Sequence, residues 1–295
     1  MKLANFRKKT AENEGFRVGV VDSEALIDLS TAAPSLPKDM ISLLEEGDSA
    51  LKQAKDAAAS AIERISLSDV TLGPPVLNPG KILAIGLNYA DHVKETGRDL
   101  PKHQIWFNKQ RNCINGPFDP VNLPKVSTDY LDYEGEMCFV IGRRCKHVPR
   151  ERVPEVIAGF CVGNDVSVRD WQRRVPTMQI GKSFDTHGPL GPWLTTPDEV
   201  GDPHNLDVKT WVNGELRQNS NTKHMIFDCY AQIEHLTQAF TLDVGDVIFT
   251  GTPDGVGAAM KPPGLLKVGD KVRIEIEKLG AIENEIVPEK AEMVI

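Results

Sequence analysis

Two glutamates separated by one glycine, Glu134 and Glu136, are the residues of this chain best placed to do chemistry. Side chains alternate along a strand, so both carboxylates would point the same way, and Gly135 would leave the other face bare for a close neighbour. Two carboxylates on one face need a cation if they are buried. The apolar residues 137–141 indicate that the strand enters a core. On spacing alone, the slightly favoured alternative is an edge strand that exposes both glutamates to solvent.

A third acidic side chain, Asp165, lies in the segment 163–170, where it would share a strand face with Ser167 and Arg169. Three carboxylate oxygens completed by water suit a hard divalent ion, Mg²⁺ or Mn²⁺ and possibly Ca²⁺. Glu134, Glu136 and Asp165 are therefore candidate ligands for such an ion.

A histidine and a glutamate three residues apart, His92 and Glu95, follow the apolar strand expected over 81–86. In the short helix expected there, these two side chains are neighbours, and the carboxylate would orient the imidazole. Such a pair can serve as a general base acting on water. The alternative is a surface pair, which is the more frequent outcome for this spacing. We also expect residues 88–112 to be mobile and to act as a lid.

Two further segments carry polar groups that could meet an anion. Lys182 stands beside the acidic cluster in the expected fold and could meet a substrate carboxylate or an enolate. The glycine-rich turn over 249–257 follows an apolar strand and offers backbone N–H groups that suit anion binding. The commoner alternative for one such turn is a tight β turn without a ligand.

Composition excludes several classes of function. The 295 residues are 40% hydrophobic and 26% charged, which is ordinary for a globular protein. The net charge of −8 and the lack of a long basic cluster argue against a nucleic-acid partner. No apolar run has the length of a membrane span, and five cysteines without a Cys-x-x-Cys pair fit reduced thiols. We therefore expect a cytoplasmic protein.

The chain divides into two expected units, a small N-terminal domain over 1–75 and a catalytic domain over 76–295. The first would hold strands over 16–21 and 25–29 and helices over 40–44 and 50–65, and the Gly- and Pro-rich segment 72–80 would end it. Beyond residue 116 short strands dominate, with helices expected over 153–158 and 231–240. The expected fold class is α+β, mostly β.

Together and in this order, five segments resemble the fumarylacetoacetate hydrolase family. The resemblance spans roughly residues 80–287, and the segment before it resembles the small N-terminal domain of many bacterial members. The segments are Ile85-Gly-Leu-Asn-Tyr-Ala-Asp-His92, Tyr133-Glu-Gly-Glu136, Gly163-Asn-Asp-Val-Ser-Val-Arg-Asp170, Gly181-Lys-Ser-Phe-Asp185 and Thr250-Gly-Thr-Pro-Asp-Gly-Val-Gly257.

The resemblance implies a mixed β-roll or β-sandwich catalytic domain, a homodimer and a bound Mg²⁺ or Mn²⁺, with Ca²⁺ in some members. It places the metal on the three carboxylates named above and catalysis on His92, Glu95 and Lys182. The residues assigned to substrate binding are Asn88, Tyr89, Arg169, Gln172 and Thr252. Leu87 departs from the small acylpyruvase members, which carry an arginine there.

The activity that this resemblance implies is hydrolysis of a carbon–carbon bond in a β-diketone or an acylpyruvate-type 2-oxo acid. His92 and Glu95 would activate water, and the metal would stabilise the enolate that leaves. Such chemistry belongs to the catabolism of aromatic compounds or sugar acids. The same site could instead serve an oxaloacetate-type decarboxylase, an enol–keto isomerase or a sugar-acid dehydratase, because a fold does not decide the reaction.

Overall fold

The computed structural model describes residues 1–11, 13–290 and 293, and β-sheets dominate this part of the chain. The largest sheet has twelve strands, ten of them in the spatial order β4-β3-β2-β1-β14-β12-β11-β17-β6-β7, with β5 beside β1 and β8 beside β14. Their bounds are β1 Lys2–Lys8, β2 Arg17–Asp22, β3 Ala25–Asp28, β4 Ile65–Ser66, β5 Val70–Leu72, β6 Ile82–Gly86, β7 Ile105–Lys109, β8 Ile114–Asn115, β11 Gly135–Ile141, β12 Ile157–Asn164, β14 Gly188–Thr195 and β17 Val247–Phe249.

A second sheet has five strands in the order β16-β15-β18-β19-β9, and a short pair joins β10 to β13. Their bounds are β9 Val121–Leu123, β10 Leu131–Asp132, β13 Ser167–Val168, β15 Asp207–Val212, β16 Glu215–Asn221, β18 Lys271–Ile276 and β19 Gly280–Pro288. The helices are α1 Leu29–Ala32, α2 Met40–Glu45, α3 Asp48–Ser60, α4 Ala90–Glu95, α5 Arg169–Gln172, α6 Pro197–Val200 and α7 Cys229–Ala239.

Strand β11 is buried on both faces, and this explains its continuous apolar sequence. Met137, Phe139 and Ile141 belong to the hydrophobic cluster shared with the five-stranded sheet. Cys138 and Val140 point the other way, into a cluster that includes side chains of the N-terminal helices α2 and α3. The mostly β, mixed α+β fold expected from the sequence is thus confirmed, and the strand that carries Glu136 lies at its centre.

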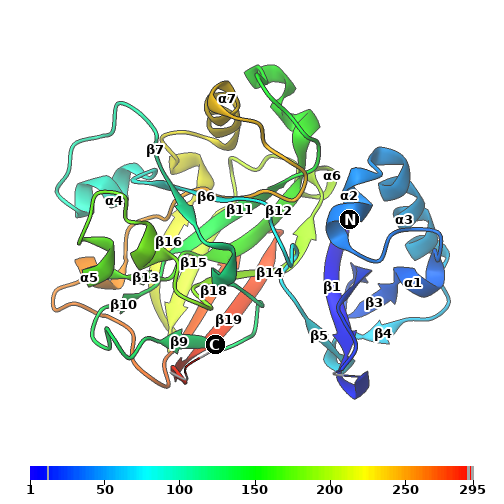
Figure 1. Ribbon diagram of the computed structural model, residues 1–295, viewed down its shortest axis with the longest axis horizontal. Coiled ribbons are helices and arrows are strands. Elements are labelled where there is room, and N and C mark those ends of the chain that lie inside the picture. Colours follow the sequence, from blue (N-terminus) through cyan, green and yellow to red (C-terminus); the bar gives the residue numbers. More distant parts are fainter. Residues whose placement is uncertain (12, 291–292, 294–295) are drawn as a thin grey trace.

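The N-terminal segment forms part of the large sheet. Figure 1 shows β1–β5 and helices α1–α3 on one side of the molecule, and β1 pairs with β14 of the larger part through the register Lys2↔Thr195 and Leu3↔Leu194. The hydrophobic cluster around α2 and α3 also contains side chains of β11, β12 and β17. The division into domains over 1–75 and 76–295 stays a prediction about independent folding units.

Several local expectations from the sequence are wrong. Asp165, Ser167 and Arg169 do not share one strand, since β12 ends at Asn164 and Arg169 begins helix α5. The helix expected over 50–65 ends at Ser60, and Ile65 lies in strand β4.

The helix expected over 153–158 is a 3₁₀ helix over Arg150–Val156 that ends where strand β12 begins, because Pro154 removes a helical hydrogen bond and the β-branched residues after it join the sheet. The lid expected over 88–112 cannot move as one piece, since Ile105–Lys109 is strand β7 and pairs with β6 along its whole length. The part outside strands is a short helix and the loop after it.

Gly135 allows the two sheets to approach closely at the start of β11. A β-carbon there would lie 2.3 Å from the hydroxyl of Thr210 and 3.1 Å from Oε1 of Gln218, both buried in the five-stranded sheet. The bare face expected from the sequence therefore receives side chains of the second sheet. The backbone N–H of Gly135 also donates a hydrogen bond of 2.9 Å to Gln218.

We expect the substitution Gly135→Ala to lower the free energy of unfolding by about 1–3 kcal/mol, because the added methyl overpacks the contact between the sheets. Urea denaturation followed by circular dichroism measures this change. Gly15→Ala is the matched control, since a β-carbon at Gly15 meets no atom within 4 Å. Equal stability of the two variants would contradict the close contact at Gly135.

Candidate active site

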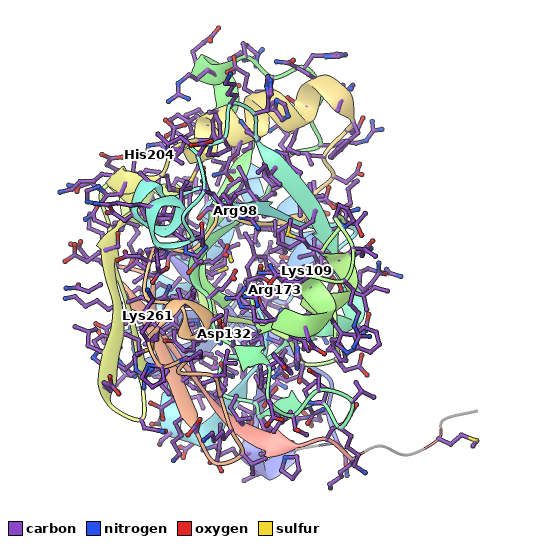
Figure 2. All side chains as sticks on the ribbon, turned by 90° about the vertical axis from the view of Figure 1, so that its left-hand side faces the viewer. Arg98, Lys109, Asp132, Arg173, His204 and Lys261 are labelled. Carbon is purple, nitrogen blue, oxygen red and sulfur yellow. The ribbon has the colours of Figure 1, made fainter. Side chains whose placement is uncertain are left out.

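A cavity of about 800 Å³ lies where several elements of the larger part of the chain meet. It is lined by the end of β6, the start of β11, helices α4 and α5, and the turn after β17. Two arginines that line it, Arg98 and Arg173, are labelled near the centre of the view in Figure 2. Eight of the residues assigned from the sequence line this cavity: His92, Glu95, Glu134, Glu136, Arg169, Gln172, Lys182 and Thr252.

Three buried carboxylates cluster at the inner end of this cavity, which Glu134 and Glu136 line and Asp165 does not. Glu134 immediately precedes β11, Glu136 lies in it, and Asp165 immediately follows the neighbouring strand β12. The pairing Glu136↔Gly163 and a hydrogen bond of 2.9 Å from the Asp165 N–H to the Glu134 carbonyl bring the three side chains together. One oxygen of each lies within 4.8 Å of the others, and each residue is at most 5% exposed.

Lysine and arginine side chains neutralise two of these carboxylates. Lys182 donates from Nζ to Glu134 at 2.7 Å and to Asp165 at 2.8 Å. Arg169 donates from Nη1 to the other oxygen of Glu134 at 2.6 Å. Burial would raise the pKa of Glu134, but the charges of Lys182 and Arg169 outweigh it and lower that pKa to about 2.

Glu136 is the carboxylate without a cationic partner of its own in the described chain. Its Oε2 accepts a hydrogen bond of 2.7 Å from the backbone N–H of Gly251. Burial, followed by the charges of Asp165 and Glu134, raises the pKa of Glu136 well above its ordinary value. A divalent cation would supply the missing positive charge, and a set of buried carboxylate oxygens fits Mg²⁺, Mn²⁺ or Ca²⁺. The described residues therefore fit the expected metal.

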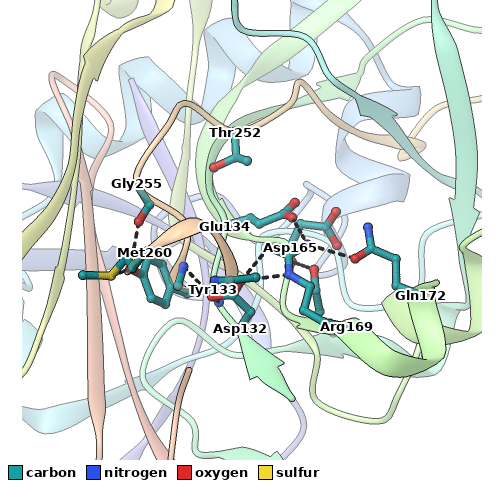
Figure 3. A network of polar contacts seen from close by, with 12 residues as sticks. Asp132, Tyr133, Glu134, Asp165, Arg169, Gln172, Thr252, Gly255 and Met260 are labelled. Atoms are coloured by element: carbon teal, nitrogen blue, oxygen red, sulfur yellow. Dashed lines mark hydrogen bonds and ion pairs between the residues drawn. The ribbon is translucent and has the colours of Figure 1, made fainter. Parts of the chain in front are cut away.

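Arg169 is held at a fixed place beside these carboxylates. Figure 3 shows its side chain between Asp132 and Glu134, with the Gln172 amide alongside. Nε donates to Asp132 at 2.8 Å, and Nη1 donates to the Gln172 side-chain oxygen at 3.0 Å. Helix α5 can approach Lys182 because Gly181 has no side chain: a β-carbon there would lie 2.2 Å from the Gln172 nitrogen. The guanidinium and the Lys182 ammonium thus reach Glu134 from different elements.

Lys109, which the sequence analysis did not assign, is part of this inner end. It is the last residue of β7, and its Nζ donates to Asp165 at 2.6 Å, to the His187 carbonyl at 3.1 Å and to the Lys182 carbonyl. Burial lowers the pKa of Lys109, but nearby negative charges, of which Asp165 is the strongest, and the hydrogen bond to Asp165 together outweigh it, so the pKa is raised. No local pattern could reveal it, because its partners lie 56 or more residues further along the chain.

The expected pair of His92 and Glu95 is present on helix α4. His92 Nδ1 lies 3.2 Å from Glu95 Oε2, and Glu95 Oε1 accepts a hydrogen bond of 2.9 Å from the backbone N–H of Gly255. The carboxylate is thus fixed from two sides and orients the imidazole. If Nδ1 carries the proton donated to Glu95, Nε2 is the nitrogen free to accept one.

The glycine-rich turn does bind anions, and these are carboxylates of the protein itself. Backbone N–H groups of this turn donate to Glu136, Glu95 and Asp132. Asp132 receives the N–H of Gly257 at 2.8 Å and that of Ala258 at 2.9 Å, in addition to the Arg169 side chain. The turn therefore positions the acidic groups of the cavity.

Three residues assigned to substrate binding have other contacts in the structure. The Asn88 amide is fully used by Phe227 and the Thr250 carbonyl, and Tyr89 is 1% exposed. Neither lines the cavity formed by the described residues. Thr252 lines it, but its hydroxyl donates to the Gly135 carbonyl and accepts from Gln218. The hydrogen bonds of Asn88 and Thr252 stabilise the surrounding structure, and contact of these residues with substrate stays a prediction.

A mostly β chain in which carboxylates, lysines and a His–Glu pair surround one cavity has the features of a small-molecule enzyme. The model of the C-terminal domain of fumarylacetoacetate (FAA) hydrolase matches residues 81–287. The chain belongs to the fumarylacetoacetate hydrolase family.

Relatives with similarity over the whole chain carry several activities in their names. A mitochondrial oxaloacetate tautomerase of Xenopus laevis is 44% identical over 97% of this chain and 90% of its own, and a human one is 43% identical over 97% and 92%. A maleylpyruvate hydrolase of Sphingobium, solved with manganese and pyruvate, has a TM-score of 0.82 at 34% identity over 98% of this chain and all of its own. An isomerase from Mycobacterium smegmatis has a TM-score of 0.77 at 32% identity, over 99% of this chain and all of its own.

We expect the substitution Glu136→Gln to weaken Mg²⁺ or Mn²⁺ binding by more than about 100-fold, since even partners of metal ligands commonly contribute 10–100-fold. The metal-free variant should be at least as stable as the unchanged protein, because the repulsion from Asp165 and Glu134 is removed. Calorimetric metal titration and thermal unfolding measure the two effects. Glu151→Gln on the exposed surface is the control, and unaltered metal affinity in Glu136→Gln would overturn the assignment.

Proposed function

We propose that this protein is a metal-dependent enzyme that interconverts the enol and keto forms of oxaloacetate or a closely similar 2-oxo acid. The observation that carries the proposal is the combination of a carboxylate cluster fit for a divalent ion with a His–Glu pair in one cavity. The relatives named oxaloacetate tautomerase support the reaction class, because their similarity extends over almost the whole chain.

A divalent ion at Glu134, Glu136 and Asp165 would act as a Lewis acid for the negative charge that develops on the substrate oxygen. Lys182 and Arg169 add positive charge at the same end of the cavity, so they favour binding of the carboxylate next to that oxygen. Both side chains are already fixed by ion pairs, and little reorganisation is needed when a substrate binds.

His92 is the candidate proton carrier. Conversion of an enol into a ketone removes a proton from the oxygen and adds one to the neighbouring carbon. With Nδ1 turned to Glu95, Nε2 can accept and return a proton while the ring stays oriented. This role requires no attacking water.

Hydrolysis of an acylpyruvate-type substrate is the second candidate. The same His92 could take a proton from water, and the solved maleylpyruvate hydrolase shares the fold over nearly the whole chain. Under this alternative the products would be pyruvate and a carboxylic acid.

The homodimer stays a prediction of the family resemblance. The cytoplasmic location also stays a prediction; no helix in the described residues has the length and apolar character needed to cross a membrane.

A substrate panel with and without Mg²⁺ or Mn²⁺ separates these reactions. It contains oxaloacetate freshly dissolved as its enol, maleylpyruvate, acetylpyruvate, fumarylpyruvate and a 2-keto-3-deoxy sugar acid. We expect metal-dependent acceleration of the loss of enol absorbance from oxaloacetate, without release of carbon dioxide. Metal-dependent release of pyruvate from an acylpyruvate, with no effect on the enol, would favour the hydrolase instead.

The substitution His92→Asn should lower kcat by about 10²–10⁴-fold, which is the usual contribution of a general acid–base group. Metal affinity should stay the same, since His92 pairs with Glu95 and makes no hydrogen bond to Glu134, Glu136 or Asp165. His103→Asn, an exposed histidine outside the cavity, is the control. Full tautomerase activity in His92→Asn would exclude it as the proton carrier.

A further inference from the structure

The outer rim of the cavity is formed by two loops whose residues have no role in the proposed reaction. Residues 96 and 98 follow helix α4, and residues 173–176 follow helix α5. Arg98 and Arg173 are exposed, whereas the carboxylate cluster and Lys182 at the inner end are buried. The cavity therefore extends from a buried acidic end to a rim that carries arginines.

The side chains of Arg98 and Arg173 have no hydrogen-bond or ion-pair partner within residues 1–11, 13–290 and 293. Their neighbour Arg174 differs, because it pairs with Asp170 at 3.2 Å and stacks on the Trp171 ring at 3.9 Å. Two guanidinium groups that line a cavity without a partner are available to an anion. Arg174 is already engaged in the protein.

With a divalent ion bound, the charges at the inner end balance only one substrate carboxylate. Four buried carboxylates, those of Asp132, Glu134, Glu136 and Asp165, stand there against the cations of Lys109, Arg169 and Lys182. A divalent ion would leave one net positive charge, which one carboxylate of a 2-oxo acid would neutralise. A second anionic group of the substrate needs cations elsewhere, and the rim supplies them.

We propose that Arg98 and Arg173 bind the distal carboxylate of a 2-oxo dicarboxylic acid whose 2-oxo acid end lies at the carboxylate cluster, an inference that rests on the proposed function. The two arginines are then residues that determine specificity for diacids over monoacids. A guanidinium group matches a carboxylate through two parallel hydrogen bonds. The protein carries a net charge of −8, so a dianion meets favourable potential only where cations gather locally.

Binding of two unreactive probes to the Mg²⁺-loaded protein tests this inference. The diacid 2-oxoglutarate and the monoacid 2-oxopentanoate have the same carbon chain and differ in the distal carboxylate. We expect calorimetry to show at least about 10-fold tighter binding of the diacid to the unchanged protein, and this preference should weaken at high salt because the arginines are exposed.

The variants Arg98→Met, Arg173→Met and their combination should lose this preference and leave 2-oxopentanoate binding unchanged. Arg174→Met is the matched control, since that side chain is already paired, and it should keep the preference. For oxaloacetate, the double variant should raise KM by about 10-fold or more and leave kcat within about twofold, since no reacting group is removed. Metal affinity should be the same in all four variants.

Equal binding of the two probes to the unchanged protein, or a preference that survives in the double variant, would overturn the inference. The proposed function can fail separately. Suppose that the protein prefers the diacid and the double variant loses this preference, but the protein does not convert oxaloacetate. That result would support the role of the arginines and reject the tautomerase. Conversion of oxaloacetate by a protein that binds the two probes equally would support the tautomerase and reject the role of the two arginines.

Discussion

The crowding of three buried carboxylates is the constraint on which the rest of the site depends. Glu134, Glu136 and Asp165 repel one another in a place where water cannot screen them. Each must therefore be matched by a cation or an N–H group. Lys182, Arg169 and Lys109 meet this need from three separate segments, so the acidic cluster also fixes how these segments meet.

Two interior strands of the large sheet position the three carboxylates. Neighbouring strands β11 and β12 hold the acidic residues at adjacent ends, and their interior faces are filled by apolar side chains that give the site a rigid base. Helices α4 and α5 with the loops after them contribute the His–Glu pair and the arginines. Rigid strands thus hold the charges that must stay fixed, and the loops carry the groups that would meet the substrate.

Local spacing predicted the parts of the site that depend on one element. The period of a strand placed Glu134 and Glu136 together, and the period of a helix placed His92 beside Glu95. Contacts between distant segments could not be predicted in this way: the lid expected over 88–112 includes Lys109, which ends the edge strand β7 and contacts Asp165. The helix expected over 153–158 failed for a related reason, since pairing with the neighbouring strands decided its structure.

The turn over 250–258 holds acidic side chains with its main-chain N–H groups alone. Three of the donors are the glycines Gly251, Gly255 and Gly257, where a β-carbon would lie within 2.7 Å of another atom, and Gly251 and Gly255 also have positive φ. This wall of the cavity therefore tolerates few substitutions. The opposite rim presents the side chains of Arg98 and Arg173 to the cavity, and there a single substitution would change the charge that a ligand meets. Members of the family could therefore acquire new substrates by changing one wall of the cavity without disturbing the other.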